Sequence, residues 1–102
     1  MSVTMRIIQQ YDITREELFL ELEKKFAELE KDREDYPNGT RMKPIAALDP
    51  TNTLIWQCEF PDLAAAQAAL DLFATDDAHE ELAAKQHPLF EKVRIEFYEN
   101  LA

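Results

Sequence analysis

The two histidines of the chain lie in one acidic stretch, TDDAHEELAAKQHPLF, residues 75–90. Imidazole and carboxylate groups are common metal ligands and general acids or bases. If residues 76–87 form one helix, however, His79 and His87 are about 12 Å apart along its axis and cannot bind one ion. Ala83 stands one turn after His79, where a zinc-protease helix has its second histidine. We therefore interpret the stretch as a capped helix and predict no metal site.

Residues that mark other common catalytic sites are scarce. Gly39 is the only glycine and Ser2 the only serine, which excludes a glycine-rich phosphate loop and a G-x-S-x-G nucleophile elbow. Cys58 is the only cysteine, so no disulfide can form within the chain, as suits a reducing compartment. The sequence predicts no particular reaction and no cofactor.

The charge of the chain limits its partners. Its 102 residues include 21 acids and 11 bases, a formal net charge of −10. This field repels phosphate groups, so we expect neither nucleic acid nor a membrane surface as a partner. The sequence has no apolar run near the ~20 residues that cross a bilayer and no secretion signal at its N-terminus. We expect one cytoplasmic domain, residues 1–102.

Apolar periodicity predicts the elements that must position any site. Residues 3–11 alternate as a strand. A helix should begin at Thr14, which can form a capping box with Glu17, and end before YPNG, residues 36–39. Its predicted apolar stripe is Leu18, Phe19, Leu22, Phe26 and Leu29, and its predicted solvated face includes Lys24, Lys25, Glu28 and Glu30.

The rest of the chain adds three predicted strands and a second helix that is broken in two. RMKPIAALDPTNTLIWQCEF, residues 41–60, predicts two strands around a turn at residues 49–52. Pro44 places the first of these strands at a sheet edge or delays its start. A helix capped by Asp62 follows, and a short helix capped by Thr75 or Asp76 ends near Pro88. VRIEFYE, residues 93–99, predicts the last strand.

This order predicts an α+β, ferredoxin-like βαββαβ fold with one antiparallel sheet and the helices on one face. Right-handed crossovers place the first and third strands at the centre. One side of the sheet is almost wholly apolar and should meet the helices; it includes Leu54, Trp56, Cys58, Phe60, Val93, Ile95 and Phe97.

The opposite side, called the open face below, is our candidate site. It combines isoleucines and a tyrosine with charges that would be unfavourable in a core. The mixture suits a face that packs against a second copy and encloses a cavity for a small molecule. The simpler interpretation, which we favour, is a dimer contact with internal salt bridges and no ligand. The predicted ligand-binding residues are Arg6, Gln10, Gln57, Glu59, Arg94, Glu96 and Tyr98.

TLIWQCEFPDLAAAQAALDLFATDDAHEELAAKQHPLFEKVRIEFYE, residues 53–99, resembles the second half of the NIPSNAP-like branch of the dimeric α+β barrel superfamily. The resemblance lies in a third strand with a tryptophan, an E-F-x-[DS]-L helix start, an Asp-rich break and an aromatic last strand. It implies a homodimer in which two sheets pair into a dimeric α+β barrel, often with a central pocket.

The superfamily that the chain resembles also includes haem-degrading enzymes and cofactor-free monooxygenases. The haem degraders have an asparagine on the first strand, a tryptophan near the end of the third and a histidine in the next helix. Here Gln9 and Gln10 stand on the first strand, Trp56 lies early in its strand, and Ala83 stands about where the histidine would be. These departures argue against haem chemistry and predict Trp56 in the core.

Two functions remain open. The first is a cytoplasmic homodimer that binds a small molecule or is purely structural. The alternative is a cofactor-independent monooxygenase or isomerase acting in the barrel cavity. In that alternative Tyr98, Glu59 or Glu96 would carry protons, assisted by Arg6 or Arg94.

Overall fold

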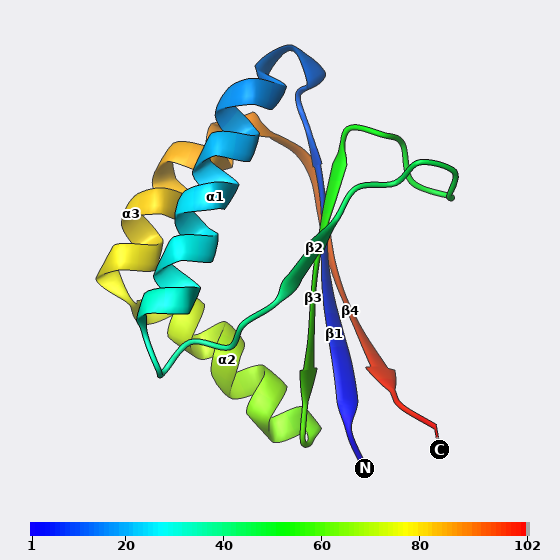
Figure 1. Cartoon of the computed structure of the whole chain (residues 1–102), viewed down its shortest axis with the longest axis vertical. Helices are drawn as coiled ribbons and strands as arrows, with labels where there is room; N and C mark the ends of the chain where they lie inside the picture. The colour runs from blue at the N-terminus through cyan, green and yellow to red at the C-terminus, as the bar shows by residue number, and fades with distance from the viewer. Residues whose placement is uncertain (102) are drawn as a thin grey trace.

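The computed structural model, which describes residues 1–101, has one four-stranded antiparallel sheet with its α-helices on one side (Figure 1). The elements in chain order are β1 Val3–Tyr11, a 3₁₀ turn Ile13–Arg15, α1 Glu16–Asp32, β2 Thr40–Met42, β3 Thr53–Phe60, α2 Leu63–Thr75, α3 Asp77–Gln86, a 3₁₀ turn His87–Leu89 and β4 Phe90–Glu99. The strand order is β2-β3-β1-β4. The predicted ferredoxin-like βαββαβ fold is confirmed, including the second helix broken in two.

The start of α1 differs from the predicted capping box. The carboxylate of Asp12 accepts hydrogen bonds from the backbone nitrogen and Oγ1 of Thr14, at 3.0 and 2.7 Å. A 3₁₀ turn therefore precedes α1, and Thr14 is not its cap. A charged carboxylate is a stronger acceptor than a hydroxyl, which favours Asp12 in this role. Asp62 and Asp76 cap α2 and α3, as predicted.

β2 is much shorter than the sequence predicts. It covers only Thr40–Met42, and the chain leaves the sheet before Pro44, which has no backbone N–H to donate. Residues 43–52, called the arm below, lie on the side of the sheet away from the helices (Figure 1). Asp49 anchors the arm by accepting two hydrogen bonds from Arg94, at 2.8 and 3.0 Å.

The core lies between the sheet and the helices in two clusters. The predicted burial of Trp56 is confirmed, and it belongs to the first of them. The clusters are Met5, Trp56, Phe60, Ala66 and Ala69, and Tyr11, Phe19, Leu22, Leu54 and Leu89. No helix in residues 1–101 has both the length and the apolar character of a membrane span.

The helix-facing side of β4 is only half covered, contrary to the prediction. Val93, Ile95 and Phe97 alternate on that side, yet they are 46%, 44% and 41% exposed. The reason is that α2 packs on the central strands β1 and β3, so the edge strand β4 projects beyond the helical layer.

Candidate ligand-binding site

A cavity of about 390 Å³ lies between the helical layer and the sheet. Mostly apolar cavities of this size with a few polar groups are typical of small-molecule sites. The apolar wall includes Ile7, Phe26, Leu29, Trp56, Leu70, Phe73, Ala83, Phe90 and Val93. The polar lining consists of Gln9, Glu23, Glu30, Tyr36, Arg41, His79, Glu80, Gln86 and His87. We call this space the helix–sheet cavity.

Gln9 brings an unpartnered amide to the helix–sheet cavity. β1 directs its side chain to the helix side of the sheet, and the residue is 7% exposed. The hydrogen bonds between described residues leave this amide without a partner. It is not sealed off, because it borders the cavity. A buried amide in this position must be satisfied by water or by a ligand.

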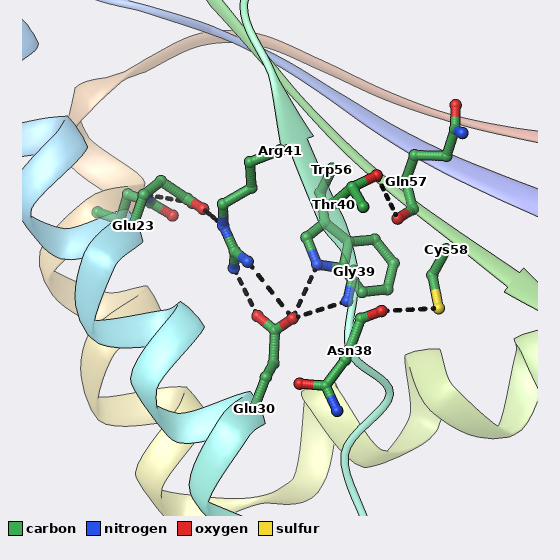
Figure 2. A network of polar contacts seen from close by, with 10 residues as sticks. Glu23, Glu30, Asn38, Gly39, Thr40, Arg41, Trp56, Gln57 and Cys58 are labelled. Carbon is green, nitrogen blue, oxygen red and sulfur yellow. Dashed lines mark hydrogen bonds and ion pairs between the residues drawn. The ribbon is translucent and has the colours of Figure 1, made fainter.

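Two buried carboxylates of α1 share one arginine at one end of the cavity (Figure 2). Arg41 of β2 donates from Nε to Glu23 at 2.8 Å and from a terminal nitrogen to Glu30. Glu30 also accepts from the indole nitrogen of Trp56 at 3.0 Å and from the backbone nitrogen of Gly39 at 3.1 Å. Burial alone would lower the pKa of Arg41, but the hydrogen bonds to Glu30 and Glu23 outweigh it and raise that pKa. The guanidinium is therefore a fixed cation.

The predicted placement of Glu30 on the solvated face of α1 is wrong. Glu23 and Glu30 are seven positions apart, about two helical turns, so both lie on the same side of the helix as Phe26. Each is buried because Arg41 compensates its charge. That compensation comes from a strand outside the helix, and helical periodicity carries no sign of it.

His79 lies among aromatic rings in the cavity wall. Its ring stacks on Phe73 with centroids 4.9 Å apart and 8° between the planes, and lies 4.8 Å from Phe26. Burial lowers the pKa of His79, and the nearby charges of Asp76 and Glu30 only partly oppose this. The imidazole is therefore neutral at neutral pH, with one nitrogen that donates and one that accepts.

Asp76 joins the start of α3 to the connection between α1 and β2. Its carboxylate caps α3 by accepting from the backbone nitrogen of His79, and accepts from Tyr36 Oη and Arg33 at 2.7 Å each. These bonds, that of Tyr36 first, lower the pKa of Asp76 to about 2. Burial, and then the bond to Asp76, raises the pKa of Tyr36. The Asp76 carboxylate thus fixes both Tyr36 and His79 in the cavity wall.

Five of the residues predicted to bind a ligand form one network on the open face. Arg6 donates to Gln57 at 2.8 Å and lies over the ring of Tyr98, 5.4 Å from its centroid. Tyr98 donates to Glu96 at 2.6 Å, and Arg94 donates to the same carboxylate at 2.8 Å. Hydrogen bonds from Tyr98 and Arg94 lower the pKa of Glu96. Their role as ligand-binding residues stays a prediction.

The other two predicted residues do not join this network. Gln10 donates to Glu91 at 3.1 Å, nearer the other end of β1. Glu59 is exposed and pairs in register with Thr4 of β1.

The helix–sheet cavity is a functional candidate that sequence reasoning missed. Its one sequence signal is Gln9, a polar residue that interrupts the apolar side of β1. His79 and Arg41 reach the same space from distant segments, so no spacing in the chain connects them. Groups of three His, Cys, Asp or Glu side chains arranged to hold a metal ion are absent from residues 1–101. Burial raises the pKa of the Cys58 thiol, which keeps it protonated at neutral pH.

No family model and no curated protein matches the sequence. Solved structures share its fold over the whole length. An uncharacterized NIPSNAP domain protein from Burkholderia xenovorans superposes with a TM-score of 0.79 at 15% identity, covering 100% of this chain and 96% of that one. A NIPSNAP family protein from Agrobacterium tumefaciens gives a TM-score of 0.81 at 10% identity, covering 99% and 94%.

A putative antibiotic biosynthesis monooxygenase from Nitrosomonas europaea superposes with a TM-score of 0.70 at 14% identity, covering 100% of both chains. At such identities the likeness concerns the fold and carries no activity with it. The chain has the ferredoxin-like α+β fold that these NIPSNAP family proteins and the putative monooxygenase share.

Proposed function

We propose that the protein binds a small, largely apolar organic molecule in the helix–sheet cavity. The observation that carries the proposal is Gln9, a residue that is 7% exposed and whose amide borders a space of about 390 Å³ and lacks a partner among the described residues. A buried polar group left unsatisfied destabilises a fold by about 1–3 kcal/mol. A polar group of the ligand would satisfy the amide, and the aromatic walls would bury the rest of the molecule.

The proposal is tested by filling the cavity. Ala83 of α3 lines it, whereas the next residue, Ala84, is exposed and does not. The uncharged fluorophore N-phenyl-1-naphthylamine should brighten with the wild type and with Ala84→Phe, and stay dim with Ala83→Phe. Circular dichroism melts establish that both variants are folded. No fluorescence with the wild type, or equal fluorescence with the two folded variants, would refute the proposal.

We further propose that the protein is a homodimer in which two open faces pack together as a barrel. Support comes from apolar side chains left in water: Ile45 and Leu48 on the arm are 95% and 97% exposed, and Tyr98 on the open face is 45% exposed. Monomers rarely keep such groups together on one side. In the dimer, Arg6 and Arg94 with their partners would lie between the two sheets, as a salt-bridged contact or as a second place for a ligand.

The proposed setting is the cytoplasm, without nucleic acid or membrane as partner. Cys58 is the only cysteine, so the chain cannot form an internal disulfide, which suits a reducing compartment. The net charge of −10 opposes contact with phosphate-rich surfaces.

A second candidate function is a cofactor-independent oxygenase or isomerase, and the neutral imidazole of His79 favours it. Such a group in an apolar cavity can take a proton from an acidic O–H or C–H of a bound substrate. Tyr98, Glu59 and Glu96 on the open face are the alternative proton carriers. Oxygen uptake over a panel of hydroquinones should be seen with the wild type and lost in His79→Phe if the cavity is catalytic. No uptake with the wild type would remove the oxygenase from consideration.

A further inference from the structure

The helix–sheet cavity is lined by more acids than bases. Three acidic residues line it, the buried Glu23 and Glu30 and the exposed Glu80, against the guanidinium of one arginine, Arg41. All three nitrogens of that guanidinium donate to Glu23 and Glu30 (Figure 2), so the arginine has little left to offer a ligand. The chain as a whole is also negatively charged, with a net charge of −10. An anion entering the cavity would therefore meet a negative potential.

The aromatic walls suit a positive charge. Trp56 meets Phe73 edge-on with ring centroids 5.7 Å apart. Tyr36, whose ring is parallel to that of Phe73 within 11°, already binds a cation, because the guanidinium of Arg33 lies over it, 4.7 Å from the ring centroid. Phe26 and Phe90 add two more rings to the lining. Ring faces carry negative electrostatic potential, so the rings of Trp56, Phe26 and Phe90 in the lining can stabilise an ammonium group in this space.

The cavity also provides directional acceptors. The unpartnered amide of Gln9 has a carbonyl oxygen that can accept a hydrogen bond from an ammonium N–H. Gln86 is buried, and its amide nitrogen donates a hydrogen bond to Glu23 at 2.8 Å. Its carbonyl oxygen is left as a second acceptor in the lining. Acceptors, aromatic rings and an excess of acidic residues thus line one cavity.

We infer that the ligand is an organic cation, a protonated amine on an aromatic or branched apolar body. This narrows the small-molecule binding proposed above, on which it rests, to one charge class. The ammonium group donates to Gln9 and lies against the ring faces, while the carboxylates stabilise its charge. The apolar body fills the space beside Phe26 and Leu70.

Three probes of similar shape but different charge separate the effect of ligand charge on affinity from the effect of ligand shape. At neutral pH 2-phenylethylamine is a cation, 2-phenylethanol is neutral and 3-phenylpropionate is an anion. Titration calorimetry on the whole chain should give the amine about tenfold tighter binding than the alcohol, and no binding of the carboxylate. Equal or weaker binding of the amine overturns the inference. If N-phenyl-1-naphthylamine still binds in that case, small-molecule binding stands and only the charge class is wrong.

Two neighbouring acids provide a matched control for the site of amine binding. Glu80 and Glu81 are both exposed on α3, but only Glu80 lines the cavity. Glu80→Gln should weaken amine binding by about threefold and leave the alcohol unchanged, and Glu81→Gln should change neither. Gln9→Leu should remove most of the preference for the amine over the alcohol. An unchanged preference in both Glu80→Gln and Gln9→Leu places the amine elsewhere and overturns the inference.

Discussion

At the scale of single residues, ligand binding explains a glutamine at position 9 better than protein stability does. Its amide, which borders the cavity, has no partner among the described residues, whereas leucine has no polar group to satisfy and the cavity leaves room for its slightly larger side chain. Gln9→Leu should therefore raise the free energy of unfolding of the ligand-free protein by about 1 kcal/mol. Urea denaturation measures the change. A clear loss of stability would mean that the amide has structural partners, such as an ordered water, and would remove the main support for the cavity.

The protonation of His79 can be followed directly. In the His87→Gln variant, His79 is the only histidine, and its ring protons report its titration by NMR. Because burial lowers the pKa of this group, we expect a midpoint below 6.5. A midpoint at or above that value would mean that the ring is solvated or paired with an acid.

The same shift fixes the sign of a pH effect on stability. The native pKa of His79 lies below its unfolded value of 6.5, so the unfolded chain takes up the proton first as the pH falls. The contribution of His79 to the free energy of unfolding is complete above pH 6.5, decreases below it, and stops decreasing below the native pKa. His79→Phe should remove this part of the pH dependence.

At the scale of elements, the connection between α1 and β2 depends on Gly39. A Cβ atom at this position would lie 2.0 Å from Nε1 and 2.1 Å from Cε2 of Trp56. The indole cannot easily move away, because it donates to Glu30. Gly39→Ala should lower the free energy of unfolding by about 1–3 kcal/mol, measured in urea. Asn38→Ala, at the exposed neighbouring position, should change it much less, and equal stability of the two variants would show that the connection adapts.

The sequence predicted the elements better than the site, for physical reasons. The order of strands and the caps Asp62 and Asp76 follow from local patterns, because periodicity and capping act within a few residues. The burial of Glu30 depends on Arg41, which joins it only once β2 is placed in the sheet. The length of β2 also depends on contacts with another part of the chain. Its pairing with β3 ends at Met42, before Pro44.

The sequence predicted which residues lie on the open face, but it did not predict the cavity on the helix-facing side of the sheet. Alternation along β1 and β4 correctly placed Arg6 and Arg94 on the open face, because strand geometry alone decides the side. The cavity on the other face exists because three helices leave a space above β1, and that depends on how their side chains pack. Gln9 could have indicated it, as a polar group on an otherwise apolar side, but the polar residues that line the cavity with it, such as His79 and Arg41, come from the distant elements α3 and β2.

At the scale of the whole molecule, the proposed homodimer has a direct test. Light scattering at micromolar concentration should give twice the chain mass of 11.9 kDa. The double variant Ile45→Ser with Leu48→Ser removes the most exposed apolar groups of the arm and should weaken the dimer by about tenfold or more. The control, Ile13→Ser with Leu63→Ser, changes exposed apolar groups away from the arm and should have little effect. A wild-type mass of 11.9 kDa at all concentrations would contradict the dimer.

The half-covered side of β4 has a consequence for kinetics. Val93 both lines the helix–sheet cavity and is 46% exposed, so it marks where the cavity meets solvent. A ligand can then enter past β4 without any helix moving, unlike in an enzyme whose lid must open first. Association would be a single bimolecular step, with an observed rate that rises in proportion to ligand concentration and reaches no plateau. Residence time would then depend on the contacts inside the cavity and not on a gate.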